Sequence, residues 1–182
     1  MGIATWLDVA ALLAAEPAFD PLSITAGAGA DGVEQNGLSV DRFAVQNLSG
    51  TPTDSRRRGL SAGLFIAVRT TLAAAETLSL VANAQDSPDN AVWTDFDHRA
   101  SAQPPTITIP SLSVGPGVLV DARDVLKQQY DLTGAARFLR CQFTANLSAA
   151  GVDTANVWGL WVFGGSEHNR FQGELVGSSA VV

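Results

Sequence analysis

The chain has 182 residues, a length that fits one domain with a hydrophobic core of its own. Hydrophobic residues make up 46% of it and charged residues 16%, a balance that excludes a disordered chain. The net charge of −7 and the pI of about 4.6 argue against direct binding to nucleic acid, because an acidic surface repels phosphates.

The single cysteine, Cys141, leaves no intramolecular disulfide, so burial and hydrogen bonds must hold the fold. The apolar run at residues 9–15 has no Lys or Arg before it and is shorter than the ~20 apolar residues of a membrane span. We therefore expect neither an export signal nor a membrane anchor at the N-terminus.

Residues 5–15 are rich in Ala and Leu and stop before Pro17, a pattern that predicts a short helix. The glycine-rich residues 26–32 predict a flexible linker. Two arrangements stay open: the helix is an N-terminal arm, or it folds back across one sheet. Residues 1–35 are assigned to this helix or arm and its linker.

After Gly37 the hydrophobic pattern takes the period of two that β-strands show. Residues 124–130 predict one or two helical turns instead. The expected strands, which turn-forming residues separate, cover residues 38–40, 43–45, 64–72, 77–84, 92–97, 106–109, 117–121, 137–147 and 157–163. About eight or nine such strands predict an all-β fold, a two-sheet antiparallel β-sandwich of the jelly-roll kind at residues 36–163, with a C-terminal tail at 164–182.

Two of these strands predict which residues are buried. The strand at 137–147 alternates strictly, which places Cys141 on its apolar face and in the core. The strand at 157–163 is apolar on both faces, as in a strand covered on both sides or packed against another subunit. We assign Trp158 to the core and expect Trp161 and Phe163 at an interface.

Residues able to carry catalysis or bind a metal are few. The only histidines, His98 and His168, each have acidic neighbours but no second ligand pair at metal-binding spacing. Asp86, Asp89 and Asn90 carry calcium-type oxygens but match a turn better than a calcium loop. Nucleophile elbows, phosphate loops and dinucleotide fingerprints do not occur. We predict no catalytic residue, no metal site and no cofactor, and therefore no enzyme.

The only dense basic cluster in this acidic chain is Arg56-Arg57-Arg58. One interpretation is a solvated loop tip. The other, which we prefer because the cluster opposes the overall charge, is contact with an acidic partner surface, since guanidinium groups pair with carboxylates.

Two segments resemble the core strands of capsid decoration (cement) proteins of tailed bacteriophages. They are Glu76-Thr77-Leu78-Ser79-Leu80-Val81-Ala82-Asn83-Ala84-Gln85-Asp86-Ser87, with Trp93 after it, and Gly134-Ala135-Ala136-Arg137-Phe138-Leu139-Arg140-Cys141-Gln142-Phe143-Thr144. The likeness covers about residues 36–163.

The resemblance implies a jelly-roll protein on the outer surface of a virion, made in the host cytoplasm and usually trimeric. Its implied partners are the major capsid protein and further copies of itself, with no nucleic acid and no membrane. The expected interface residues come from the arm, the arginine cluster and the strand that is apolar on both faces: Trp6, Leu12, Leu13, Arg56, Arg57, Arg58, Trp161 and Phe163.

The rival hypothesis is a carbohydrate- or receptor-binding β-sandwich module of a virion. Trp93, Trp158 and Trp161 could form a sugar-stacking platform, and this hypothesis predicts that Trp93 or Trp161 is solvent-exposed and coplanar with the sugar-binding face.

Overall fold

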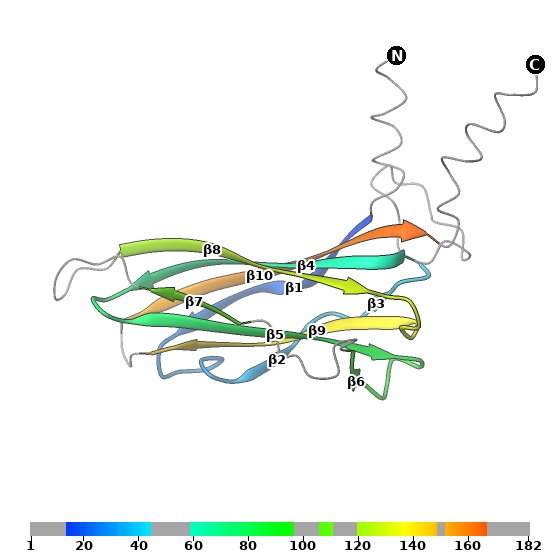
Figure 1. The fold of residues 1–182 in the computed structure, drawn as a ribbon. Coiled ribbons are helices and arrows are strands. Elements are labelled where there is room, and N and C mark those ends of the chain that lie inside the picture. The colour runs from blue at the N-terminus through cyan, green and yellow to red at the C-terminus, as the bar shows by residue number, and fades with distance from the viewer. Residues whose placement is uncertain (1–13, 45–58, 97–105, 111–119, 149–151, 167–182) are drawn as a thin grey trace, which may run out of the picture.

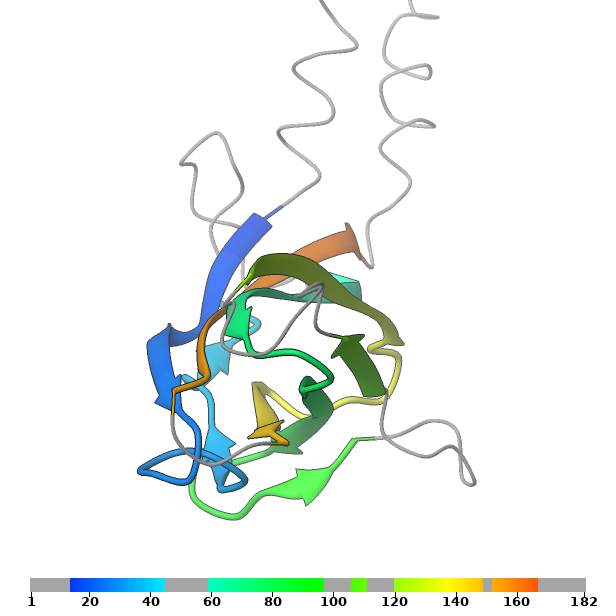
Figure 2. The same cartoon turned by 90° about the vertical axis from the view of Figure 1, so that its left-hand side faces the viewer.

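A computed structural model describes residues 14–44, 59–96, 106–110, 120–148 and 152–166. In these residues the chain is all-β, and two antiparallel sheets pack face to face as a sandwich (Figure 1). The view along the strands shows the two layers closing around a shared interior (Figure 2). No helix that could span a membrane occurs in the described ranges.

Sheet A contains four long strands. Their order across the sheet is β1 (Ala14–Thr25), β10 (Thr154–Ser166), β4 (Gly59–Leu72) and β8 (Val120–Asp131). β1 and β8 are therefore the two edges. β1 carries Pro17 and Pro21 and has register shifts beside both, which suits an edge because proline cannot donate to a sheet ladder.

Sheet B has β9 (Phe138–Leu147) and β5 (Thr77–Ser87) at its centre. β2 (Glu34–Asn36) and β3 (Val40–Asp41) both pair with β9. β6 (Thr94–Asp95) and β7 (Thr106–Pro110) both pair with β5. Each edge of sheet B is thus made of two short pieces instead of one long strand.

The strand order is that of a jelly roll. If each broken edge of sheet B counts as one strand, the sheets read β1-β10-β4-β8 and β2/β3-β9-β5-β6/β7. Apart from β5 and the edge β6/β7, which follow one another directly, strands that are neighbours in one sheet are joined through the other sheet. This connectivity gives two interlocked Greek keys. The predicted fold class, an all-β jelly-roll sandwich, is confirmed.

The core lies between the sheets and is made by alternate residues of the long strands. Sheet A contributes Leu64, Ile66 and Trp161, while sheet B contributes Leu80 and Leu139, all of them fully buried. Phe19 of β1 stacks on Phe143 of β9, with ring centroids 4.1 Å apart. Cys141 is buried as predicted.

The predicted domain start at residue 36 is wrong, because β1 already belongs to the sandwich. Ala14 and Ala15, the last residues of the predicted helix, pair with Phe163 and Val162 of β10. Residues 1–13, the rest of the predicted arm, lie outside the described residues. At the other end β10 continues to Ser166, beyond the predicted end at 163.

The predicted linker at residues 26–32 is a defined turn. Gly27 and Gly29 have positive φ angles of 72° and 62°, a backbone conformation that glycine adopts without strain. The Asp31 carboxylate accepts hydrogen bonds from the backbone N–H groups of Gly27 and Leu147, both at 2.7 Å. This side chain therefore fastens the turn to β9.

The predicted helical turns at 124–130 are also wrong, since this segment is the middle of β8. β8 pairs with β4 in unbroken register from Asp131↔Ser61 to Val120↔Leu72. Ala122, Leu126 and Tyr130 recur every four residues, a spacing that one face of a helix and one face of a strand share. Pairing with β4 decides between the two.

Candidate functional site

β10 places its two tryptophans on opposite faces of sheet A. Trp161 is 0% exposed, with its ring 5.7 Å from that of Tyr130 and 6.1 Å from that of Phe163. Trp158 is 45% exposed and Leu160 41% exposed on the outer face. The predicted faces of this strand are therefore wrong: Trp161 and Phe163 are core residues, and Trp158 faces outward.

The reason lies in the pattern of this strand. Residues 157–163 are apolar on both faces, so their alternation does not say which face is inside. Trp161 pairs with Leu64 of β4, which is buried, whereas Trp158 pairs with Ala67 on the other side. Pairing with β4 therefore determines that Trp161 faces the core and Trp158 faces outward.

Exposed apolar side chains from three strands meet on this outer face. Trp158 of β10 lies opposite Ala67 of β4, which lies opposite Val125 of β8. In the next row Leu160 lies opposite Phe65. We call these five residues the apolar patch; Phe65, Val125, Trp158 and Leu160 are all among the exposed large hydrophobic residues.

The patch is uneven because large and small residues alternate along β4. A shallow hollow lies over Ala67, lined by Val125, Trp158 and Lys127 among others. A second hollow lies over Gly63, where the ring of Phe65 forms part of the wall. An uneven apolar surface suits contact with protruding side chains of a protein partner better than it suits a small reacting substrate.

Basic side chains accompany the patch on its β8 side. Arg123 and Lys127 of β8 are exposed, and Arg123 lies opposite Arg69 of β4. β8 also contains Asp121, Asp124 and Asp131, and Arg69, Arg123 and Asp131 take part in interactions of their own. Three of the six described basic side chains, those of Arg69, Arg123 and Lys127, are therefore on the outer face of sheet A.

The outer face of sheet B is polar instead. Gln142 of β9 donates to Glu34 of β2 at 2.8 Å, and Gln85 of β5 donates to Asp95 of β6 at 2.9 Å. Gln85 also donates to Gln142 at 3.4 Å, which joins the two pairs into a ladder across all four strands. The ladder holds the short edge strands to the centre of the sheet.

Trp93 is covered on one ring face by the side chain of Arg140. The guanidinium carbon lies 4.4 Å from the ring centroid, within the range of a cation–π contact, and Arg140 also donates to Gln85 at 2.8 Å. Trp161 lies in the core, so it is not available for the glycan stacking that the rival hypothesis expects of Trp93 or Trp161.

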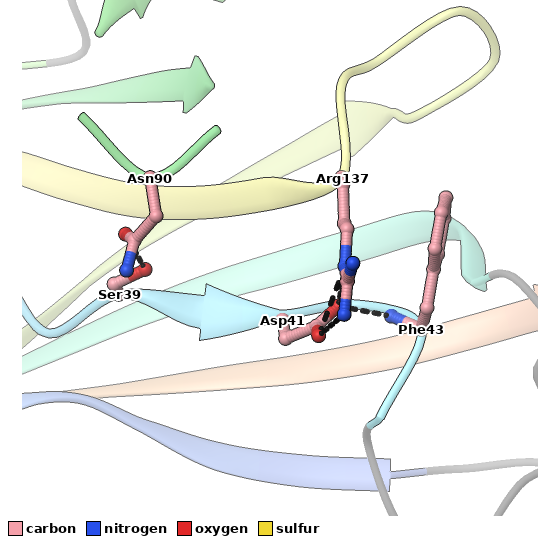
Figure 3. A network of polar contacts seen from close by, with 5 residues as sticks. All are labelled: Ser39, Asp41, Phe43, Asn90 and Arg137. Atoms are coloured by element: carbon pink, nitrogen blue, oxygen red, sulfur yellow. Dashed lines mark hydrogen bonds and ion pairs between the residues drawn. The ribbon is translucent and has the colours of Figure 1, made fainter. Parts of the chain in front are cut away.

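An ion pair joins the edge strand β3 to β9 at one corner of the sandwich (Figure 3). Arg137 donates to Asp41 Oδ2 through Nη2 at 2.6 Å and through Nε at 3.0 Å. The hydrogen bond from Arg137 lowers the pKa of Asp41, and the backbone N–H of Phe43 adds to the effect. In the same view Ser39 donates to Asn90, which ties β3 to the turn after β5. We assign this corner a structural role.

The carboxylates at the end of β5 and in the turn after it accept hydrogen bonds from backbone N–H groups. Asp86 accepts from the backbone N–H of Ala136 at 2.7 Å, and Asp89 accepts from those of Ala91 and Val92 at 2.9 and 3.0 Å. These backbone bonds lower the pKa of Asp89. Within the described ranges no group of three or more His, Cys, Asp or Glu residues is placed to hold a metal ion.

Several predicted site residues lie outside the described residues, so their placement stays a prediction. They are the arm residues Trp6, Leu12 and Leu13 and the cluster Arg56, Arg57 and Arg58. The histidines His98 and His168, which were not assigned to a site, also lie outside the described residues. The residues that sequence reasoning missed are those of the apolar patch. Their signal was the run of outward apolar positions Phe65, Ala67, Trp158 and Leu160.

No protein-family model matches the sequence, and no curated protein matches it. Among solved structures, the chain is similar to the VP2 subviral particle of infectious bursal disease virus, with a TM-score of 0.42 and 12% identity over 86% of this chain and 33% of that one. A structure of the Gx strain of the same virus gives 0.41 and 12%, over 86% of this chain and 32% of that one.

Eiger TNF from S. frugiperda gives a TM-score of 0.39 and 10% identity, over 84% of this chain and 91% of that one. The chain spans about a third of the length of the two viral chains. The jelly-roll assignment rests on the strand order of this chain itself.

Proposed function

We propose that this chain is a structural decoration protein, without enzymatic activity, that binds the outer surface of a phage head and stabilises contacts between major capsid subunits. The observation that carries the proposal is the apolar patch on sheet A. A folded domain gains nothing by exposing Trp158, Leu160, Phe65 and Val125 together, whereas a partner surface that covers them gains their burial. The sequence resemblance to decoration proteins supports the choice of partner.

The size of the patch bears on the assembly state. Full burial of one large apolar side chain is worth about 1.5–3 kcal/mol, so side chains already more than half buried offer roughly 1 kcal/mol each. Four of them fall short of the ~8 kcal/mol of a micromolar complex. Linking several copies multiplies the effective affinity without new contacts, which supports an oligomer as the binding unit. The choice of a trimer comes from the sequence resemblance to decoration proteins.

The rival carbohydrate- or receptor-binding function has less support. Glycan sites combine an aromatic face with polar groups that converge on the sugar. Trp158 lies beside Ala67 and Val125, and the charged residues Arg123, Asp124 and Lys127 line the same hollow. The polar groups beside Trp93 are engaged with one another. The sequence resemblance, which points to a decoration protein, therefore decides between the two functions.

The test is binding to heads of the virus whose genome encodes this chain, prepared without it. We expect the purified protein to co-sediment with the heads to saturation and to raise their rupture temperature. The variant Trp158→Ser with Leu160→Ser is expected to bind at least tenfold more weakly. Absence of co-sedimentation by the unaltered protein, with retention on a glycan array, would establish the rival instead.

A matched control comes from two apolar residues exposed elsewhere. Val92 is 65% exposed and Val152 is 67% exposed, and neither belongs to the patch. The variant Val92→Ser with Val152→Ser removes a similar number of exposed apolar side chains. We expect it to bind heads like the unaltered protein.

A further inference from the structure

We propose that the surface which covers the apolar patch is a protein surface with an apolar centre and carboxylate side chains along the side that faces β8. The inference rests on the proposed function and names the chemistry of the partner contact. Lys127 of β8 lies on the side of the patch where we expect the partner's carboxylates.

The charge on this face differs from that of the chain as a whole. The chain carries 18 acidic and 11 basic residues, yet the described outer face of sheet A holds Arg69, Arg123 and Lys127. They are gathered toward β8, whereas β10 at the centre of the patch contributes Trp158 and Leu160. The face is therefore apolar at the centre and basic on one side.

Lys127 is placed to contact whatever covers the patch. It lies opposite Phe65 in the register of β8 and β4, on the same outer face, and it lines the hollow over Ala67 together with Trp158 and Val125. A partner side chain seated in that hollow comes within reach of the Lys127 ammonium group. Asp124 also lines the hollow, but its carboxylate accepts a hydrogen bond from the backbone N–H of Val125 at 2.7 Å, and Arg123 and Lys127 outnumber it there. Partner carboxylates near Lys127 gain a charge-assisted hydrogen bond, while basic side chains there are repelled.

A protein fits this face better than the other anionic class of partner. Nucleic acid offers phosphates, but the net charge of −7 opposes its approach, and an apolar centre gains little from a phosphate backbone. A second copy of the chain is the remaining alternative, and the experiment separates it from a capsid subunit.

Lys127 is the only lysine in the sequence, which makes a direct chemical test possible. A water-soluble carbodiimide converts a carboxyl group into an O-acylisourea. The Lys127 Nζ amine attacks its acyl carbon, which forms an amide without a spacer and releases the substituted urea. Mass spectrometry of the complex with heads is expected to find Lys127 joined to an Asp or Glu of the major capsid protein. A Lys127 link to a second copy of this chain, or no link in saturated heads, would overturn the inference.

Two variants separate the charge of Lys127 from its reactivity. Lys127→Arg keeps the charge but loses the coupling amine, so it is expected to bind normally without the cross-link. Lys127→Glu is expected to weaken binding about five- to tenfold at about 0.1 M salt. The effect is expected to be much smaller at about 1 M salt, because the electrostatic screening length there is only about 3 Å.

Val92→Glu controls for added negative charge away from the patch, and we expect it to bind within about twofold of the unaltered protein. If Val92→Glu weakens binding as much as Lys127→Glu does, the inference is wrong although the proposed function stands. Failure of the unaltered protein to bind heads would remove the proposed function, and the inference with it.

Discussion

Trp158 and Trp161 lie three residues apart on β10 and occupy opposite environments, one 45% exposed on the outer face of sheet A and the other fully buried between the sheets. An odd separation on a strand places two side chains on opposite faces. One tryptophan therefore contributes to the stability of the sandwich, and the other is available to a partner.

Substituting these two residues separates stability from binding. Trp161→Ala is expected to lower the free energy of unfolding by about 3–5 kcal/mol, because it leaves a large cavity in the core. Trp158→Ala is expected to lower it by less than about 1 kcal/mol. Urea unfolding followed by circular dichroism measures both. Equal losses for the two variants would contradict the assignment of faces.

Gly37 is required by the close approach of β1 and β9. A Cβ atom there would lie 2.4 Å from the backbone oxygen of Ala18 and 2.7 Å from Cys141 Sγ. Backbone atoms cannot move aside easily, so Gly37→Ala is expected to cost about 3 kcal/mol of stability.

Gly29→Ala is the control for this substitution, since its Cβ meets no atom within 4 Å and only its φ of 62° opposes alanine. We expect a cost of about 1 kcal/mol there. The same urea titration compares the two, and a smaller loss for Gly37→Ala than for Gly29→Ala would show that the strands are farther apart than described.

Cys141 is expected to be chemically inert while the protein is folded. Burial raises the pKa of its thiol to about 12, so the thiolate fraction at pH 8 is about one in ten thousand, roughly a thousand-fold below that of a free thiol of pKa 9. Reaction with a disulfide reagent is expected only in denaturant. Rapid labelling of the folded protein would contradict the burial of this side chain.

The Asp41–Arg137 pair predicts a definite pH dependence. Because Arg137 lowers the pKa of Asp41 below its ordinary 3.8, the pair stabilises the fold fully above that ordinary value and loses its contribution as the pH falls through the lowered pKa. NMR titration measures the carboxyl directly. In Arg137→Gln the pKa of Asp41 is expected to rise, and an unchanged value would show that the ion pair does not form in solution.

The sequence analysis correctly predicted the strands in which apolar and polar residues alternate in step with buried and exposed positions. In β5 and β9 every second residue is apolar and the others are mostly polar, so Leu80, Cys141 and Phe143 were correctly expected on one buried face. The turn at Asp89 followed from side chains that bond to their own backbone. From these elements the all-β sandwich was predictable.

The remaining elements depend on neighbours that a sequence does not display. β1 contains two prolines and β8 has apolar residues four apart, so each is a strand because of the partner with which it pairs. The apolar patch was missed for the same reason, because Trp158 and Trp161 are equally apolar and only the packing of β10 on β4 separates them.

Oxidative footprinting with hydroxyl radicals, followed by mass spectrometry, tests most directly whether the outer face of sheet A is the surface that meets the capsid. Trp158 is exposed and oxidisable in the free protein, and Trp93 on the sheet B side provides an internal reference. On saturated heads we predict that oxidation of Trp158 falls several-fold while that of Trp93 is unchanged. Equal oxidation of Trp158 in the free and bound protein would contradict the account.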